Sequence, residues 1–384
     1  MLYLSQTDFK NFLLYRQGLI GDYQFKGKEG VLSCFNRIHL VQYDPVDVCG
    51  KNAEIVLNAR VKDFEKKMLY DLLYIDQKLI EGYDKKLCVF NREDWNYLSP
   101  VRFSKLSRRE DPTEALHVSD EIINLLHSQE YVSVKSFEAK NRYNWYWGHS
   151  ASIYQIALER LFIEGRICIA YRKGNIKYYT LNRLYNKDQQ EIMDNNYYKW
   201  HIQRRIESIG ALWCSTSSVW DYIPGCTQRI RKKLVQELVE QKKIIELGVE
   251  AIEGSFYCSA DDLKYLEIKY DRFPKRIEFL APLDNMIWDR NLVSQVFGFE
   301  YRWEIYIPKK QRRFCSYCLP ILWGNEFIGR IDIKVEDTCL MVRNIWIEKK
   351  TDEEFFFQLK TKIKNFAKFN HCKVIEAECL EKIL

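Results

Sequence analysis

The residues best placed to do chemistry lie in the stretch 40–45, which reads Leu-Val-Gln-Tyr-Asp-Pro. Its alternating pattern predicts a strand, so Gln42 and Asp44 should project from one face, roughly 7 Å apart at their Cα atoms. Pro45 should hold Asp44 in an extended conformation. An amide and a carboxylate presented together could orient and activate a water molecule. The alternative is that Asp44 and Pro45 only begin a turn, with Gln42 exposed.

Two helices with polar and cationic first turns are candidates for nucleic-acid contacts. One is expected to begin near residue 150, and the other after Thr227. The candidate side chains are Ser150, Ser152 and Gln155 on the first helix, and Gln228, Arg229 and Lys232 on the second. Short polar and cationic side chains near a helix N-terminus suit contacts to phosphates and base edges. Contacts to another protein are the alternative use of such helices.

A third candidate for DNA contacts is the segment 308–313, which follows a strand pattern over 302–307. Its four cations are Lys309, Lys310, Arg312 and Arg313. Four like charges at the tip of a hairpin cannot neutralise one another, so the segment favours contacts with phosphates. A solvated turn is the alternative.

No group of residues has the spacing of a metal site. Cys315 and Cys318 form a CxxC pair, but both lie in a strand pattern, where a separation of three places them on opposite faces. The sequence also has no nucleotide-type phosphate loop and no nucleophile elbow. We therefore expect neither a metal nor a cofactor.

The length and composition set the class of protein. A chain of 384 residues is expected to form two to four domains. A net charge of +6 does not by itself require a polyanionic partner. Twelve cysteines and an N-terminus without a signal-peptide pattern predict reduced thiols in the cytoplasm. No run of about 18 apolar residues occurs, so we expect no membrane span.

An order of helices followed by a hairpin occurs twice in the middle of the chain. In 111–186 it consists of helices over 113–126, 134–138 and about 150–165, then strands over 167–171 and 176–180. In 187–270 it consists of helices over 190–209, 217–222 and from Thr227, then strands over 244–247 and 255–258. This order is the plan of a winged helix-turn-helix, and its repetition strengthens the interpretation.

The two ends of the chain complete the predicted organisation. Residues 1–110 fit a divergent third copy, with helices near 7–15, 31–38 and 52–75, strands near 79 and 87–90, and a linker at 101–112. Residues 271–384 predict strands at 302–307, 315–323, 327–334 and 339–347, a helix at 352–369 and a strand at 374–378. The expected fold class is mainly α with β (α+β), with three tandem winged helix-turn-helix units followed by a β-rich C-terminal domain bearing a basic hairpin.

The C-terminal third carries a long set of recognisable motifs. They are Leu-Ala-Pro-Leu-Asp at 280–284, Trp-Asp-Arg at 288–290, Phe-Gly-Phe-Glu-Tyr at 297–301, Glu-Ile-Tyr at 304–306, Leu-Pro at 319–320, Gly324 and Gly-Arg-Ile-Asp-Ile-Lys at 329–334. With these motifs, essentially the whole chain resembles the YcaQ/AlkZ family of winged-helix DNA glycosylases. The family's catalytic motif is Gln, an apolar or aromatic residue, then Gln or Asp. It corresponds here to Gln42-Tyr43-Asp44.

The resemblance implies a function, and this sequence departs from the family's motifs at two places. It implies a monofunctional DNA glycosylase that removes N7- or N3-alkylated purines from double-stranded DNA at an open site, including bulky adducts and interstrand crosslinks. Separately, we expect a monomer, since nothing in the sequence requires a dimer, located in the cytoplasm and at the nucleoid when bound to DNA. Asp44 would be the base and Gln42 would position water. Leu283-Asp284-Asn285 stands where Phe-Asp-Pro is expected, and Cys315-Ser316 stands near an expected glycine. The alternative function is a non-catalytic winged-helix transcriptional regulator, which has no reason to keep Gln42 and Asp44.

Overall fold

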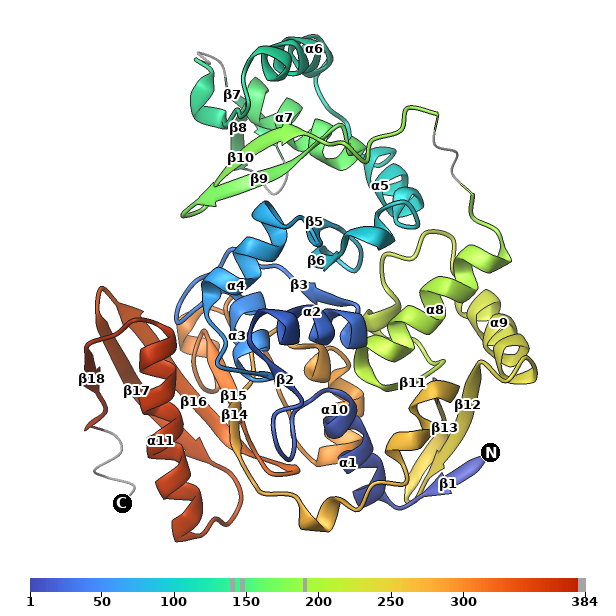
Figure 1. Ribbon diagram of the computed structural model, residues 1–384, viewed down its shortest axis with the longest axis vertical. Helices are drawn as coiled ribbons and strands as arrows, with labels where there is room; N and C mark the ends of the chain where they lie inside the picture. Colours follow the sequence, from blue (N-terminus) through green and yellow to red (C-terminus); the bar gives the residue numbers. More distant parts are fainter. Residues whose placement is uncertain (139–141, 146–148, 189–191, 379–384) are drawn as a thin grey trace. The chain divides into compact units, whose positions relative to one another are not determined.

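The computed structural model describes residues 1–138, 142–145, 149–188 and 192–378, and it has the mixed α and β composition expected from the sequence (Figure 1). The chain divides into two units. Unit 1 consists of Met1–Leu69, Tyr198–Asp221 and Cys226–Leu384, and unit 2 consists of Tyr70–Tyr197 and Tyr222–Gly225. The finer division into domains at 110, 186 and 270 stays a prediction.

The helices of unit 1 come from the beginning, middle and end of the chain. They are α1 (Gln6–Arg16), α2 (Gly27–Ile38), α3 (Asn52–Asn58), α9 (Gln228–Glu240), α10 (Arg290–Phe297) and α11 (Glu353–Phe369), together with most of α4 (Lys66–Tyr70) and α8 (Asn195–Ile209), each of which crosses a unit boundary. The continuous helix predicted over 52–75 is wrong, because Asp63 has a positive φ of 57°, which a right-handed helix does not allow. The first residues of the predicted helix 190–209 lie outside the described residues, and α8 begins at Asn195.

The C-terminal part of unit 1 is built on a five-stranded sheet in the order β14-β15-β16-β17-β18. Its strands are β14 (Ile277–Phe279), β15 (Cys318–Trp323), β16 (Glu326–Glu336), β17 (Cys339–Ile347) and β18 (Val374–Glu376). Neighbours are antiparallel except β17 and β18. Helix α11 packs against this sheet through a ring contact of Phe366 with Phe279, with 5.5 Å between centroids. The β-rich character predicted for this region is confirmed.

A second sheet joins the N-terminus to the predicted 244–259 hairpin. Its order is β1-β12-β13-β11, with β1 (Leu2–Leu4), β12 (Ile244–Val249), β13 (Ile252–Ser259) and β11 (Ala211–Trp213). The hairpin β12–β13 was predicted, whereas the parallel pairing of β1 with β12 was not. Helix α1 packs on this sheet through Phe9, whose ring centroid lies 4.7 Å from that of Phe256. Two short strands, β2 (Phe25–Lys26) and β4 (Val61–Lys62), also pair in unit 1.

Unit 2 contains the first predicted helix and hairpin set. Its elements are β5 (Leu79–Tyr83), β6 (Leu87–Asn91), α5 (Ser99–Leu106), α6 (Thr113–Ser128), β7 (Arg142–Trp145), β8 (His149–Ser152), α7 (Ile153–Glu164), β9 (Ile167–Lys173) and β10 (Ile176–Leu181). Ile122, Ile156 and Leu161 lie in its core, as the periodicity predicted. Gly165 ends α7 with a φ of +82°, also as predicted. The pairing of β7 with β8 was not predicted.

The linker predicted over 101–112 is wrong for its first half, because that half belongs to α5. Arg102 is buried there, its guanidinium lies 4.0 Å from the Trp95 ring, and it donates to the Trp95 carbonyl at 2.7 Å. Arg109 forms a paired contact with the Asp111 carboxylate at 2.8–3.2 Å. The polar composition that suggested a linker therefore includes side chains that make buried contacts. None of the helices in the described parts of the chain combines the length and apolar character needed to cross a bilayer.

Candidate active site

The predicted strand around Gln42 is β3 (Leu40–Gln42), and it ends at that residue. Gln42 is buried, with 8% of its surface exposed. Its side-chain oxygen accepts no hydrogen bond from the described residues. A buried acceptor without a protein partner is suited to hold a water molecule. The alternative in which Gln42 is merely an exposed residue is therefore wrong.

Two asparagine amides hold the backbone of β3. The Asn52 amide donates to the Gln42 carbonyl at 2.7 Å, while its oxygen accepts from the Leu283 N–H at 3.0 Å. The Asn285 amide donates to the Leu40 carbonyl at 2.9 Å. Sequence analysis missed both roles. The signals available were the polar residue at the start of a predicted helix and the asparagine that stands in place of an expected proline.

Asp44 lies beyond the end of β3, so the strand prediction is wrong for 43–45. Pro45 has no N–H to donate to a neighbouring strand, and the Asp44 carboxylate accepts from the Val46 N–H at 2.9 Å. The turn considered from the sequence is therefore present. Asp44 is half-buried, and no cation among the described residues forms an ion pair with it.

The environment of Asp44 favours its neutral form. Burial raises the pKa of this carboxyl above its usual value, and the hydrogen bond from Val46 opposes the shift only in part. A carboxylate with a raised pKa is a stronger base than a solvated one. Asp44 can therefore accept a proton at neutral pH, provided that a water molecule lies within its reach.

The loop after Asp44 is anchored at two points to the C-terminal part of unit 1. The Val48 carbonyl accepts from the Val335 N–H of β16 at 2.8 Å, and the Cys49 carbonyl accepts from the Asn370 amide at 3.1 Å. Asp284, next to the Asn285 that holds β3, forms two hydrogen bonds of 2.7 Å with Arg60, and both side chains are fully buried. The segment that carries Gln42 and Asp44 is thus fixed by residues from both ends of the sequence.

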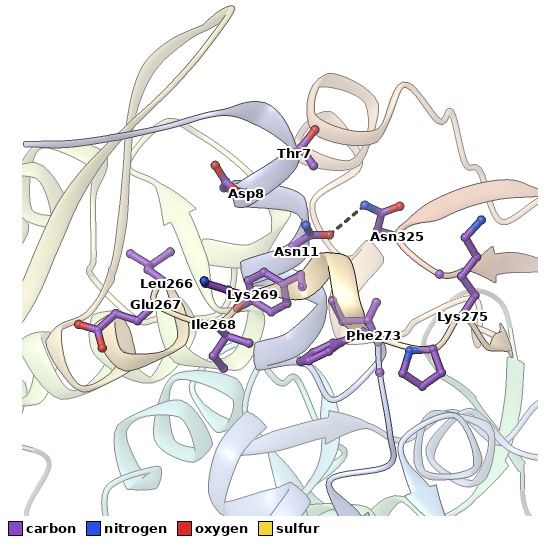
Figure 2. Close-up of a pocket in the computed structure, with 15 residues that line it drawn as sticks. Thr7, Asp8, Asn11, Leu266, Glu267, Ile268, Lys269, Phe273, Lys275 and Asn325 are labelled. Carbon is purple, nitrogen blue, oxygen red and sulfur yellow. Dashed lines mark hydrogen bonds between the residues drawn. The ribbon is translucent and has the colours of Figure 1, made fainter.

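Neither Gln42 nor Asp44 lines the hollow shown in Figure 2. This hollow has a volume of about 610 Å³ and lies between α1 and the segment 266–275, with Asn11 hydrogen-bonded to Asn325 at 2.9 Å. Within the described ranges, no three or more His, Cys, Asp or Glu side chains gather as a metal site would require.

The residues proposed from the first helix lie at the start of α7 in unit 2. The Ser152 hydroxyl caps this helix by accepting from the Gln155 N–H at 3.2 Å. The Ser150 hydroxyl, in β8, accepts from Arg142 at 2.8 Å. Both hydroxyls thus already have protein partners, and Ser150 and Gln155 are the exposed members of the set.

The second helix is α9 of unit 1, and Thr227 caps it as predicted, at 3.3 Å from the Ile230 N–H. Gln228 accepts from the Thr216 hydroxyl at 3.3 Å. Arg229 and Lys232 are exposed, and neither forms an ion pair with another described residue. These two cations are therefore the ones in α9 that are available to phosphates.

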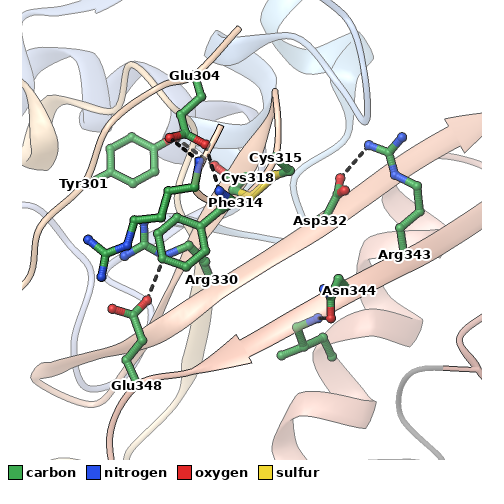
Figure 3. The surroundings of a disulfide bond; sticks show 12 residues. Tyr301, Glu304, Phe314, Cys315, Cys318, Arg330, Asp332, Arg343, Asn344 and Glu348 are labelled. Atoms are coloured by element: carbon green, nitrogen blue, oxygen red, sulfur yellow. Dashed lines mark hydrogen bonds and ion pairs between the residues drawn. A yellow bond between two sulfur atoms is a disulfide. The ribbon is translucent and has the colours of Figure 1, made fainter. Parts of the chain in front are cut away.

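The basic segment 308–313 is not a hairpin, and the strand predicted before it is wrong. It is a loop with a 3-10 turn at Lys309–Gln311. The Glu304 carboxylate folds the chain back by accepting from the N–H groups of Arg313 and Phe314 at 3.1 and 3.0 Å (Figure 3). The Arg312 side chain donates to the Ile307 carbonyl at 2.8 Å. Lys309 and Lys310 are exposed and form no ion pair with other described residues.

The CxxC pair next to this loop forms a disulfide between Cys315 and Cys318 (Figure 3). The expectation of reduced thiols is wrong for this pair. Only Cys318 belongs to β15, so the opposite-face rule for a strand does not apply, and the turn between the two residues brings their Cα atoms to 5.6 Å. The pair is not part of a metal site in this arrangement.

Comparison with known proteins gives a match to a family and a match to a solved structure. The family model described as DNA glycosylase AlkZ-like matches residues 35–369. Among solved structures, the Streptomyces sahachiroi DNA glycosylase AlkZ matches with a TM-score of 0.61 and 11% sequence identity, and the match covers 97% of this chain and 100% of that chain. The structural likeness establishes a shared fold, and the family match includes the segment with Gln42 and Asp44.

Proposed function

The chain belongs to the AlkZ-like family of DNA glycosylases, and we propose that it hydrolyses the N-glycosidic bond of N7- or N3-alkylated purines in double-stranded DNA. Bulky adducts and interstrand crosslinks are included among the proposed substrates. The proposed product is an abasic site, because the reaction uses water as nucleophile and leaves the DNA backbone intact.

The chemistry explains why one carboxylate can be sufficient. An alkylated purine of this kind is positively charged, so it leaves as a neutral base when it takes the electron pair of the glycosidic bond. Ordinary glycoside hydrolysis needs a second carboxyl group because the leaving oxygen must be protonated. Here the remaining tasks are to stabilise the cationic sugar and to remove a proton from the attacking water.

We assign these tasks to Asp44 and Gln42. Asp44 would stabilise the oxocarbenium-like sugar and accept the proton of water as the oxygen bonds to the anomeric carbon. Gln42 would position that water through its side-chain oxygen. The observation that carries the assignment is that Asp44 is half-buried, has a raised pKa and has no cationic partner among the described residues. A carboxylate with a merely structural role is usually paired.

The decisive experiment is single-turnover excision from a duplex that contains N7-methylguanine, with alkali used to cleave the abasic product. Asp44→Asn should lower the rate at least about a hundredfold, since it removes the charge and the basic site but keeps the shape. Gln42→Ala should cause a smaller loss. Strand cleavage that needs no alkali would contradict the monofunctional mechanism.

Equilibrium binding to the same duplex and a thermal melt serve as controls. Binding should be nearly unchanged in Asp44→Asn, because a carboxylate contributes little to the ground-state affinity for a polyanion. A folded Asp44→Asn protein that excises at the normal rate would remove the catalytic assignment. A wild-type protein that binds DNA but excises none of a panel of alkylated bases would instead favour the regulator function.

A further inference from the structure

A hollow in unit 2 is lined by cations from two separate elements. It has a volume of about 450 Å³ and lies between α5, the turn that joins β5 to β6, and the turn at 222–225. Helix α5 and the residues that follow it contribute Lys105, Arg108 and Arg109, and the β5–β6 turn contributes Lys86. The cations near the end of α5 could be explained by the dipole of that helix. Lys86, from another element, is not explained in this way.

The cations differ in how far the protein neutralises them. Arg109 is paired with Asp111, and its side chain is almost fully buried. Arg108 is exposed and forms no ion pair or hydrogen bond with another described residue. Lys86 and Lys105 likewise have no carboxylate within ion-pair distance among the described residues. The one acidic residue in the lining, Asp84, is buried. Three cations around the hollow therefore remain available to an anion.

Aromatic rings hold two of these ammonium groups in place. The Lys86 ammonium lies 4.4 Å from the centre of the Tyr222 ring, and the Lys105 ammonium lies 4.3 Å from that of Tyr83. The Tyr83 hydroxyl is in turn fixed by a hydrogen bond of 2.5 Å to Glu159. Because the rings restrict the two lysines before any ligand binds, less side-chain entropy is lost when an anion arrives.

The electrostatics around Lys105 favour the binding of an anion. Burial of its ammonium group lowers the pKa of Lys105, and although Glu159 opposes the shift, the charges of Arg109 and Lys86 add to it. The positive charges around the hollow thus repel one another. A bound anion would relieve this repulsion, whereas an apolar group or a further cation would not.

We propose that Lys86, Lys105 and Arg108 bind a phosphate of the DNA backbone in this hollow. The proposal rests on the proposed function, which makes DNA the partner. A phosphodiester fits the site because it offers acceptor oxygens to several donors at once. The interaction would be independent of sequence and of the lesion, and it would add to the affinity without taking part in the reaction.

The test is binding of the full-length protein to an undamaged duplex, measured by fluorescence anisotropy at several salt concentrations. The variant is Lys86→Ala/Lys105→Ala/Arg108→Ala. Affinity should fall about tenfold or more, the value for removing hydrogen bonds between charged groups. The salt slope, which is the steepness with which the logarithm of affinity falls with the logarithm of salt concentration, should decrease by about one unit for each phosphate that is no longer bound. Lys187→Ala, which removes an exposed lysine of the same unit outside the hollow, should leave both unchanged.

A second arm separates DNA from a small phosphorylated ligand. The shift of the melting temperature with inorganic phosphate is measured for the wild type and the triple variant. Loss of that shift with unchanged DNA affinity and salt slope would overturn the DNA assignment in favour of a small phosphorylated molecule. If the triple variant has wild-type DNA affinity and the wild-type shift of melting temperature with phosphate, the site itself is ruled out.

Two further choices keep the outcome interpretable. If the triple variant does not melt cooperatively, Arg108→Gln serves instead, because this side chain is exposed and forms no hydrogen bond or ion pair with another described residue. It should still weaken binding, and Arg108→Lys should restore it in part. Because the duplex is undamaged, the result does not depend on excision. If the protein excises no base, the proposed function is wrong, but the binding measurement still tests the phosphate site.

Discussion

Asp44 lies where a carboxylate can act as a base at neutral pH. Its carboxyl is removed from part of the solvent, one oxygen accepts the Val46 N–H, and no described cation holds it in the ionised form. Gln42, two residues earlier, buries an acceptor that no described residue satisfies. An unsatisfied buried acceptor costs free energy in the folded protein. A structure that retains it two residues before a partly desolvated carboxylate is typical of a site that binds water.

The raised pKa of Asp44 gives a prediction about pH. A base acts only when it is deprotonated, so the excision rate should fall as pH decreases through the pKa of Asp44. Because burial raises this pKa, the acidic limb should be centred at higher pH than the value of about 3.9 for a solvated Asp. Single-turnover rates between pH 4 and pH 8 on a stable alkylated duplex measure the limb. A rate that is flat down to the solvated value would contradict the role of burial.

Asn52 gives a second prediction at the scale of the residue. Asn52→Ala removes the amide that holds the Gln42 carbonyl and the Leu283 N–H, so Gln42 should lose its fixed position. Excision should slow by less than in Asp44→Asn, and DNA affinity should be unchanged. The free energy of unfolding should fall by about 1–3 kcal/mol, the cost of leaving buried polar groups unpaired. Asn58→Ala, at the other end of α3, is the matched control.

If Asn52→Ala unfolds more easily but excises at the wild-type rate, Asn52 is only structural. The effect of Asn52→Ala on the reaction is therefore judged from the single-turnover excision rate at saturating enzyme, because a small loss of stability does not lower that rate.

At the scale of the element, the segment 308–313 shows how neighbouring cations acquire different roles. The charged groups of Arg312 and Arg313 have protein partners: Arg312 donates to the Ile307 carbonyl, and Arg313 lies 3.7 Å from the Glu300 carboxylate in an exposed ion pair. Lys309 and Lys310 are exposed on the 3-10 turn. The four cations predicted as one group thus divide into two that already have protein partners and two that are available to phosphates.

This division changes the expected effect of mutation. Lys309→Ala/Lys310→Ala should weaken binding to duplexes of any sequence and lower the salt slope by about two units, since each cation that neutralises a phosphate accounts for about one. Arg312→Ala should act mainly through the shape of the loop, so it should lower thermal stability as well as binding. Lys350→Ala, an exposed lysine beyond β17, is the control for net charge. An unchanged salt slope in the double lysine variant would make the loop a solvated turn.

At the scale of the whole molecule, unit 1 is assembled from distant segments. Arg60 follows α3, yet it forms paired hydrogen bonds with Asp284 and a further one of 2.8 Å with Gln17. Burial disfavours its charge, but the Asp284 carboxylate offsets this effect and holds the pKa of Arg60 above its usual value. The N-terminal and C-terminal thirds are thus joined by a buried ion pair. We therefore expect them to unfold together.

Asp284→Ala tests this coupling. The substitution leaves the Arg60 guanidinium buried without its partner, which costs about 3–5 kcal/mol. It also removes the cap of the turn at Asn285–Ile287, where Asp284 accepts from the Met286 N–H at 2.9 Å. Urea unfolding followed by two probes, one in each third of unit 1, should show one shifted transition. Asp337→Ala, at an exposed turn, should have little effect. Two separate transitions would mean that the thirds fold independently.

The sequence alone determined the features that depend on local pattern. The hydrophobic periodicity of α6, α7 and α9, the caps at Gly165 and Thr227 and the hairpins β9–β10 and β12–β13 follow from neighbouring residues, and the structure confirms them. The motif Gln42-Tyr43-Asp44 was likewise found without the structure, although its catalytic role stays a prediction.

Tertiary structure decided the features that depend on residues far apart in the chain. Nothing near Leu2–Leu4 indicates that this strand pairs with β12, because the pairing is stabilised by hydrogen bonds to a strand more than 240 residues away. Asn285 could not be assigned to β3 for the same reason. The segment 101–112 was interpreted as a linker because burial of a charge is decided by its partner, and one partner of Asp111 is Arg160, which donates to it at 3.3 Å from 49 residues away.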